Sequence, residues 1–180
     1  LSHNREKIKE LASGQLKDEA NAWFVGEPFK VFYDYKKEGI WQLGEEAAAA
    51  ANGQEPGDIK VQDVDGNGVI TTDDRIIYSQ RPDVTFGFNN TFNYKGFDLS
   101  VFLYARLGQW IAYDYNTTYR INALENGGNV DYWTPENPTN AFPCPNKSKS
   151  YTQVTYYSTL KYEDGSFFKI RDITFGYTFK

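Results

Sequence analysis

An acidic stretch in the first half of the chain has the residue types and the spacing of a calcium-binding loop. Its residues 63–74 read DVDGNGVITTDD. Side-chain oxygens stand at the first, third and fifth positions, glycine at the sixth permits a sharp turn, and a carboxylate occupies the twelfth. Alternate side chains in such a loop converge on one cation. The predicted calcium ligands are the Val69 carbonyl and the side chains of Asp63, Asp65, Asn67, Thr71 and Asp74.

This loop differs from the usual calcium loop in two respects. Aspartate replaces glutamate at the twelfth position, and its shorter side chain makes bidentate binding harder, which predicts weaker affinity. The flanking residues lack the pattern of two amphipathic helices, so the loop does not belong to an EF-hand domain. A metal-free alternative stays open, because Asp and Asn side chains in turns also bond to their own backbone. A cation bound here would be structural rather than catalytic.

The other residues with useful chemistry give little support to catalysis. Cys144 is the only cysteine of the chain, which excludes an internal disulfide and a cysteine-based zinc cluster. His3 is the only histidine, so a Ser-His-Asp triad would have to be built close to the end of the chain. We therefore expect no enzyme activity. The 24 Asp and Glu residues outnumber the 19 Lys and Arg residues, and the net charge of −5 disfavours a nucleic-acid partner.

The elements that would position these residues are strands with one apolar and one polar side. Residues 85–94 place Phe or Tyr at most even positions and Thr, Gly or Asn at the odd ones. After a Lys-Gly turn, residues 97–107 alternate again, with Leu, Val and Ala on one parity. Near the end of the chain, Ile173, Phe175 and Tyr177 alternate with polar or small residues. The pattern predicts a transmembrane hairpin over 83–108 and a further strand within 166–180.

The length of these strands and their aromatic content favour a membrane barrel over a soluble sandwich. Strands of soluble domains are typically about 5–6 residues long, whereas a strand that crosses the outer membrane needs about 9–11. Aromatic residues make up 17% of the chain and need an apolar or interfacial environment. Three or four strands cannot close a barrel. We therefore predict an all-β fold that is part of a large antiparallel transmembrane β-barrel with long extracellular loops, one of which holds a short helix at 45–51.

Two long connections flank the predicted hairpin. Short turns of outer-membrane barrels face the periplasm and long loops face outside, so residues 12–82 and 109–165 are predicted to be extracellular. Flat aromatic side chains in the second connection can stack on the sugar rings or peptide groups of a substrate. The candidates are Trp110, Tyr113, Tyr115, Tyr119, Tyr132 and Trp133. The alternative is that these rings pack within the loop itself or line the membrane interface.

Several motifs occur in one order along nearly the whole chain. They are YKKEGIW at 35–41, EEA at 45–47, PGDIK at 56–60, the acidic loop followed by Arg75, FGFNN at 86–90, YKGFDLS at 94–100, WTPENPTN at 133–140 and DGSFFKIR at 164–171. In this order they resemble the C-terminal part of the SusC-like (SusC/RagA) TonB-dependent outer-membrane transporters. A series of independent motifs in one order is far more specific than any single motif.

The resemblance implies a function for the whole transporter. Such proteins are plugged barrels of about 22 strands in the bacterial outer membrane, surrounded by its lipid. They import oligosaccharides or peptides, they are powered through TonB, and a SusD-like lipoprotein forms a hinged lid. The plug, the TonB-contacting N-terminal region and the last part of the barrel are expected to lie outside this chain. The aromatic candidates of the second connection then become contacts for the substrate or for the lid.

A second class of protein stays open at this point. A soluble β-rich, calcium-stabilised carbohydrate-binding or adhesion module would also contain alternating strands and an acidic loop. It would need a second sheet to cover the apolar side of the strands. Dependence on detergent separates the two classes, because only the barrel exposes that side to lipid.

Overall fold

The computed structural model describes residues 1–114, 128–148 and 153–179 of the chain. The chain forms two compact units. The first comprises Leu1–Phe32, Tyr78–Ile111 and Asp164–Lys180, and the second comprises Tyr33–Ile77 and Ala112–Glu163. Among the described residues, no helix is long and apolar enough to cross a membrane.

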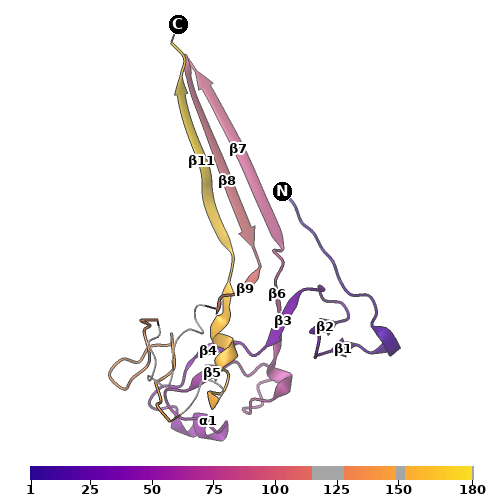
Figure 1. The fold of residues 1–180 in the computed structure, drawn as a ribbon, viewed down its shortest axis with the longest axis vertical. Coiled ribbons are helices and arrows are strands. Elements are labelled where there is room, and N and C mark those ends of the chain that lie inside the picture. Colours follow the sequence, from indigo (N-terminus) through magenta and orange to yellow (C-terminus); the bar gives the residue numbers. More distant parts are fainter. Residues whose placement is uncertain (115–127, 149–152, 180) are drawn as a thin grey trace. The chain divides into compact units, whose positions relative to one another are not determined.

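The main element of the first unit is an antiparallel sheet of three long strands (Figure 1). Its members are β7 (Val84–Tyr94), β8 (Phe97–Leu107) and β11 (Phe167–Tyr177), in the order β11-β8-β7. Lys95 and Gly96 link β7 to β8, and both have a positive φ, as a two-residue turn of type I′ requires. The predicted hairpin and the predicted last strand are therefore present, each strand being 11 residues long.

Cross-strand pairing places the apolar residues of the three strands on one face of this sheet. Phe92 of β7 lies opposite Leu99 of β8, which lies opposite Phe175 of β11. The apolar face consists of Val84, Phe86, Phe88, Phe92, Tyr94, Phe97, Leu99, Val101, Leu103, Ala105, Leu107, Phe168, Ile170, Ile173, Phe175 and Tyr177, together with Asn90. The polar face carries Thr85, Asn89, Thr91, Asn93, Asp98, Ser100, Arg106, Lys169, Asp172 and Thr174, and the rings of Phe102, Tyr104 and Phe167.

A β-bulge at Arg171 keeps β11 in phase with its neighbour. Ile170 is opposite Leu103 and Asp172 is opposite Phe102, so Arg171 is the extra residue. In the sequence, the apolar residues of this strand change parity between Ile170 and Ile173, and a regular strand would send one group to the polar face. The bulge absorbs this change of parity, and both groups lie on the apolar face.

Short strands make up the remaining sheets. They pair β1 (Lys17–Asp18) with β2 (Trp23–Phe24), β3 (Val31–Asp34) with β6 (Ile76–Ser79), β10 (Tyr162–Asp164) with β9 (Trp110–Ala112), and β4 (Lys37–Ile40) with β5 (Ile59–Val61). The described residues include one α-helix, α1 (Glu46–Ala51), as predicted to within one residue. They also include 3-10 helices at Ala12–Gly14, Thr72–Asp74 and Tyr157–Lys161.

The second unit has a hydrophobic core of its own. Its buried members are Ile40, Ile59, Val61, Trp133, Val154 and Leu160. The first three come from β4 and β5, and the others come from the connection between β9 and β10. Parts of the two predicted loops thus pack on each other, and these connections contain short strands as well as the predicted helix.

Candidate functional site

The end of α1 holds one side of the acidic loop in place. The Asn52 side chain accepts a hydrogen bond from the backbone N–H of Ile70 (2.8 Å) and donates one to the carbonyl of Ala48 (3.1 Å). Asn52 is the C-cap of the helix, where the run of helix-forming alanines ends. The helix that the sequence predicts therefore positions the candidate metal loop.

Three carboxylates of the loop come together. The side chains of Asp63, Asp65 and Asp74 each offer an oxygen, and these oxygens lie within 4.8 Å of one another. Asp74 is fully buried, with 0% of its surface exposed. Among the described residues, no Lys or Arg forms an ion pair with any of the three. The cluster thus concentrates negative charge and hard oxygen donors, which are the ligands that Ca²⁺ and Mg²⁺ take.

Backbone hydrogen bonds keep the buried carboxylate of Asp74 ionised. It accepts hydrogen bonds from the N–H groups of Thr71 (2.7 Å) and Val64 (2.8 Å). The hydrogen bond from Thr71 contributes most to holding the pKa of Asp74 below its usual value, while burial acts in the opposite direction. An ionised carboxylate has about four lone-pair positions, so these bonds leave capacity for a cation.

The chain wraps closely around Asp63. One oxygen of its carboxylate accepts the N–H of Gly66 (2.8 Å) and the other accepts the N–H of Gly68 (2.7 Å). Gly68 has a φ of +84°, and Gly66 one of +72°, values that side chains other than glycine rarely adopt. The sharp turn predicted at the sixth position is present.

The other three predicted ligands have local roles in the structure. The Asn67 side chain accepts the N–H of Val69 (2.8 Å) and donates to Asp65 (2.7 Å). Thr71 caps the 3-10 helix that follows, since its hydroxyl accepts the N–H of Asp73 (3.2 Å). These hydrogen bonds are of the kind that the metal-free alternative requires. The loop thus contains both a cluster of carboxylates and a self-bonded turn, by which we mean a turn whose side chains bond to its own backbone.

Trp133 belongs to the core and not to an exposed binding surface. Only 4% of its surface is exposed, and its indole N–H donates to the side chain of Gln42 (2.8 Å). Its ring lies so close to Gly57 that a Cβ there would stand 2.8 Å from it. This burial favours the alternative that the Trp133 ring packs within the connection itself, because its apolar contacts lie within the second unit.

The remaining aromatic candidates differ in exposure. Trp110 packs edge-on against the buried Tyr78 within the first unit, with ring centroids 4.7 Å apart. Tyr113 and Tyr132 are 50% and 43% exposed, so their rings are accessible in this chain. Tyr115 and Tyr119 lie outside the described residues.

Two of the sequence motifs contact each other, although no local feature of the sequence predicts this contact. Asn140, the last residue of WTPENPTN, accepts a hydrogen bond from the N–H of Ile40 (2.9 Å) in YKKEGIW. It also accepts one from the Gln42 side chain (3.2 Å). A Cβ at Gly39 would stand 2.6 Å from the Asn140 amide oxygen, so glycine permits this close approach. The order of the motifs was visible in the sequence, but nothing local indicated that these two meet.

Comparison with known proteins agrees with the motif order. No protein-family model matches the chain. Two proteins of Formosa agariphila are similar to it: TonB-dependent receptor P3, 32% identical over an alignment of 199 residues, and TonB-dependent receptor P26, 31% identical over 195. Each alignment covers 98% of this chain and 19% of the relative. In the solved structures, a chain of the RagAB peptide importer in its open-open state matches 97% of this chain and 19% of its own length, with a TM-score of 0.58 and 22% identity.

Over nearly its whole length, the chain matches one segment of a TonB-dependent receptor, and it shares the fold of the RagAB chain. It spans about a fifth of the length of the relatives that it matches. The receptor is a protein of the bacterial outer membrane, as predicted. The predicted fold class is confirmed, since strands far outnumber the one α-helix among the described residues and the similar solved structure has the same fold.

Proposed function

We propose that the sheet β11-β8-β7 is part of the barrel wall of an outer-membrane transporter, with its apolar face toward lipid and its polar face toward the lumen. The observation that carries this proposal is the continuous apolar face, which runs across three strands of equal length. Much of it is exposed in this chain, including 61% of Ile173 and 66% of Phe175. Soluble monomers rarely expose a continuous apolar surface of this kind.

The dimensions of the strands support the same arrangement. Eleven residues extend about 36 Å at about 3.3 Å per residue. A tilt of about 45° reduces the height to about 25 Å, which matches the apolar band of an outer-membrane barrel. The soluble module is the weaker alternative, because no second sheet covers the apolar face among the described residues.

The transported substrate is an oligosaccharide or a peptide, and a SusD-like lipoprotein closes over the outer surface. Support comes from the relatives, which are named as TonB-dependent receptors, and from RagAB, which is named as a peptide importer. Energy reaches the transporter through TonB, which contacts a part of the receptor outside this segment. The exposed rings of Tyr113 and Tyr132 are candidates for the contact with lid or substrate. Reduced co-purification of the lipoprotein with a Tyr113→Ala, Tyr132→Ala receptor is the test of that contact.

The acidic loop binds Ca²⁺ as a structural ion. Asp63, Asp65 and Asp74 supply the carboxylates that already lie together, and Asn67, Thr71 and the Val69 carbonyl complete the ligand set. In the native receptor this loop faces outside, like the rest of the two long connections. We assign no catalytic role to the segment, since the named relatives are receptors and an importer.

Cysteine accessibility tests the position of the sheet in the membrane. Ser100→Cys and Val101→Cys receptors would be prepared separately with Cys144 replaced by Ser, and treated in intact outer membranes with a water-soluble maleimide. Because the two neighbours point to opposite faces, we expect labelling of the cysteine at position 100 and protection of the one at position 101. Equal labelling at both positions would exclude a wall with one face in lipid.

A further inference from the structure

The polar face of the sheet is divided into two halves of different chemistry. The half far from the Lys95-Gly96 turn carries cations and aromatic rings, which we call the cationic patch. Its residues are Phe102, Tyr104, Arg106, Phe167, Lys169 and Arg171. The half near the turn carries short polar groups, and there Thr91, Ser100 and Asn89 form a chain of side-chain hydrogen bonds.

Aromatic rings hold two of the cations in place. The Arg171 guanidinium carbon lies 5.6 Å from the ring centroid of Phe102 and 6.0 Å from that of Tyr104. The Lys169 ammonium lies 5.4 Å from the Phe167 ring. Stacking uses the flat face of a guanidinium and leaves the N–H donors at its edge available for an anion. The bulge at Arg171 is what brings this residue to the polar face beside Asp172.

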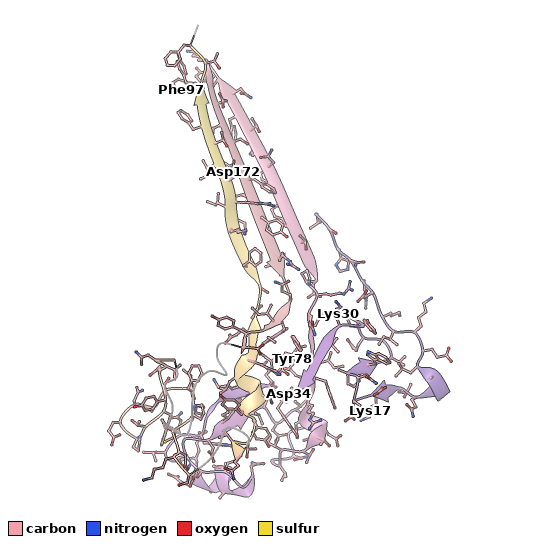
Figure 2. The ribbon with its side chains drawn as sticks, in the orientation of Figure 1. Lys17, Lys30, Asp34, Tyr78, Phe97 and Asp172 are labelled. Atoms are coloured by element: carbon pink, nitrogen blue, oxygen red, sulfur yellow. The ribbon has the colours of Figure 1, made fainter. Side chains whose placement is uncertain are left out.

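The cations of the patch have no carboxylate partners within the described part of the chain. No ion pair joins Arg106, Lys169 or Arg171 to an acidic side chain there. Asp172, labelled on β11 in Figure 2, borders the patch, and its carboxylate accepts a hydrogen bond from the Thr174 hydroxyl (2.8 Å). A wall of like charge within a narrow channel focuses the field and attracts ions of opposite charge.

A cavity adjoins the patch at Arg106. It has a volume of about 250 Å³, and its walls include Ser2, Gln80, Thr85 and the side chains of Arg81 and Arg106. Arg81 forms an ion pair with Glu6 (2.6 Å), whereas Arg106 forms no ion pair with a carboxylate of the described residues. Arg106 lies opposite Thr85 on one side and Phe167 on the other, which connects the cavity to the patch. From Arg106 to Phe102 the patch extends about 13 Å along β8.

We propose that the cationic patch and its cavity bind carboxylate groups carried by the transported solute on its way through the lumen. The inference rests on the proposed function, because it requires the polar face to line the lumen. Charge complementarity supports this proposal. The stacked cations, which form no ion pair with an acidic side chain of the described residues, would face the same channel as the solute, and Arg and Lys form charge-assisted hydrogen bonds with carboxylates. The patch thus selects for acidic members of the oligosaccharide or peptide class.

The experiment measures binding to the purified full-length receptor by calorimetry at low ionic strength. The carboxylate probes are trigalacturonate and triglutamate, and the neutral probes are galactotriose and triglutamine. A receptor with Lys169→Gln and Arg171→Gln is compared with a Lys95→Gln receptor, which loses a cation of the same hairpin outside the patch. We expect the double variant to bind the better carboxylate probe about tenfold more weakly, because hydrogen bonds to charged groups are lost. The Lys95→Gln receptor should bind as the unmodified one does.

The outcomes separate the possible occupants. Preference for trigalacturonate shows that the carboxylates belong to a sugar, and preference for triglutamate shows that they belong to a peptide. Either result supports the proposal. Lack of binding of both carboxylate probes to the unmodified receptor, or an equal loss for neutral and acidic probes, overturns it. A lower melting temperature of the double variant with unchanged probe affinity would assign the patch to an acidic segment of the receptor itself and would also overturn it. Failure of the proposed function is recognised separately, by equal labelling of the cysteines at positions 100 and 101.

Discussion

Asp74 links the acidic loop to pH through hydrogen bonds to its own neighbours. The pKa of its carboxyl is lowered in the fold, chiefly by the N–H of Thr71. A group whose pKa is lowered on folding stabilises the fold above its unfolded pKa of about 3.9, and this contribution is lost as the pH falls through the lower folded value. We expect protection of the Thr71 and Val64 amides against hydrogen exchange, corrected for intrinsic rates, to decline below about pH 4. In an Asp74→Asn receptor this decline should be absent, whereas an Asp73→Asn receptor should retain it.

Calcium should stabilise the same loop. Three carboxylates within 4.8 Å of one another repel each other, and a bound cation removes this repulsion. Addition of millimolar Ca²⁺ to the chelated receptor should slow hydrogen exchange across residues 63–74, and an Asp63→Asn, Asp65→Asn variant should lose this response. Exchange that is identical with and without Ca²⁺ in the unmodified receptor would leave the self-bonded turn as the correct interpretation.

Gly57 tests the packing of the second unit at a single residue. It has a φ of +95°, and a Cβ would stand 2.8 Å from both Trp133 and Cys144. Gly57→Ala should destabilise the unit by about 1–3 kcal/mol through overpacking and backbone strain. Gly53→Ala is the matched control, since its φ is +68° but no atom lies within 4 Å of the added Cβ. Limited proteolysis of the receptor should be faster for Gly57→Ala than for this control; equal rates would show that the contact with Trp133 is unimportant.

Because β11 contains a bulge, the effect of deleting a single residue from this strand depends on where the deletion lies. Removing Arg171 leaves Ile170 and Asp172 opposite Leu103 and Phe102, so assembly of the barrel should survive. Removing Thr174 instead forces a choice between a shifted register and a regular strand that places Asp172 on the apolar face. We expect the fraction of receptor that migrates as a folded barrel in unheated gel samples to be near normal for the first deletion and strongly reduced for the second. Equal defects would contradict the position of the bulge.

The long strands could be predicted from the sequence because each strand carries its own alternation. The positions of Phe86, Phe88 and Phe92 predict the apolar face of their strand even when the neighbouring strand is not known. The bulge could not be predicted, since a change of parity in one strand has no meaning until the neighbouring strand is known. The pairing of the short strands β4 and β5 and the burial of Ile40 could not be predicted for a related reason: Ile40 is buried by residues of a connection about a hundred positions away.

In the candidate site, too, features that depend on the local sequence could be predicted, whereas features that depend on distant residues could not. The ligand spacing of the acidic loop is local, and it correctly indicated the turn at Gly68 and the grouping of carboxylates. The exposure of an aromatic side chain is not local, because it depends on what the distant chain packs against. Trp133 and Tyr132 are adjacent in sequence, yet the first is buried in the core and the second is exposed.

At the scale of the whole molecule, the sheet is incomplete without neighbours. Among the described residues, the outer edges of β11 and β7 pair with no further strand, apart from the single bridge between Ser2 and Thr85 at the edge of β7. Unpaired edges in a membrane are costly, and barrels remove them by closure. This segment, which spans about a fifth of its relatives, therefore needs strands from the rest of the receptor on both sides.

Arginine substitutions at adjacent positions of β8 show whether one face of this sheet meets lipid. Val101 lies near the middle of the strand on the apolar face, and Ser100 is its neighbour on the polar face. The measurement is the free energy of unfolding of the full-length receptor in lipid vesicles, for Val101→Arg and Ser100→Arg. We predict a cost of about 2–4 kcal/mol for Val101→Arg if it lies near the bilayer midplane, and a much smaller cost for Ser100→Arg. Equal costs at the two positions would exclude a sheet with one face in lipid and the other in the lumen.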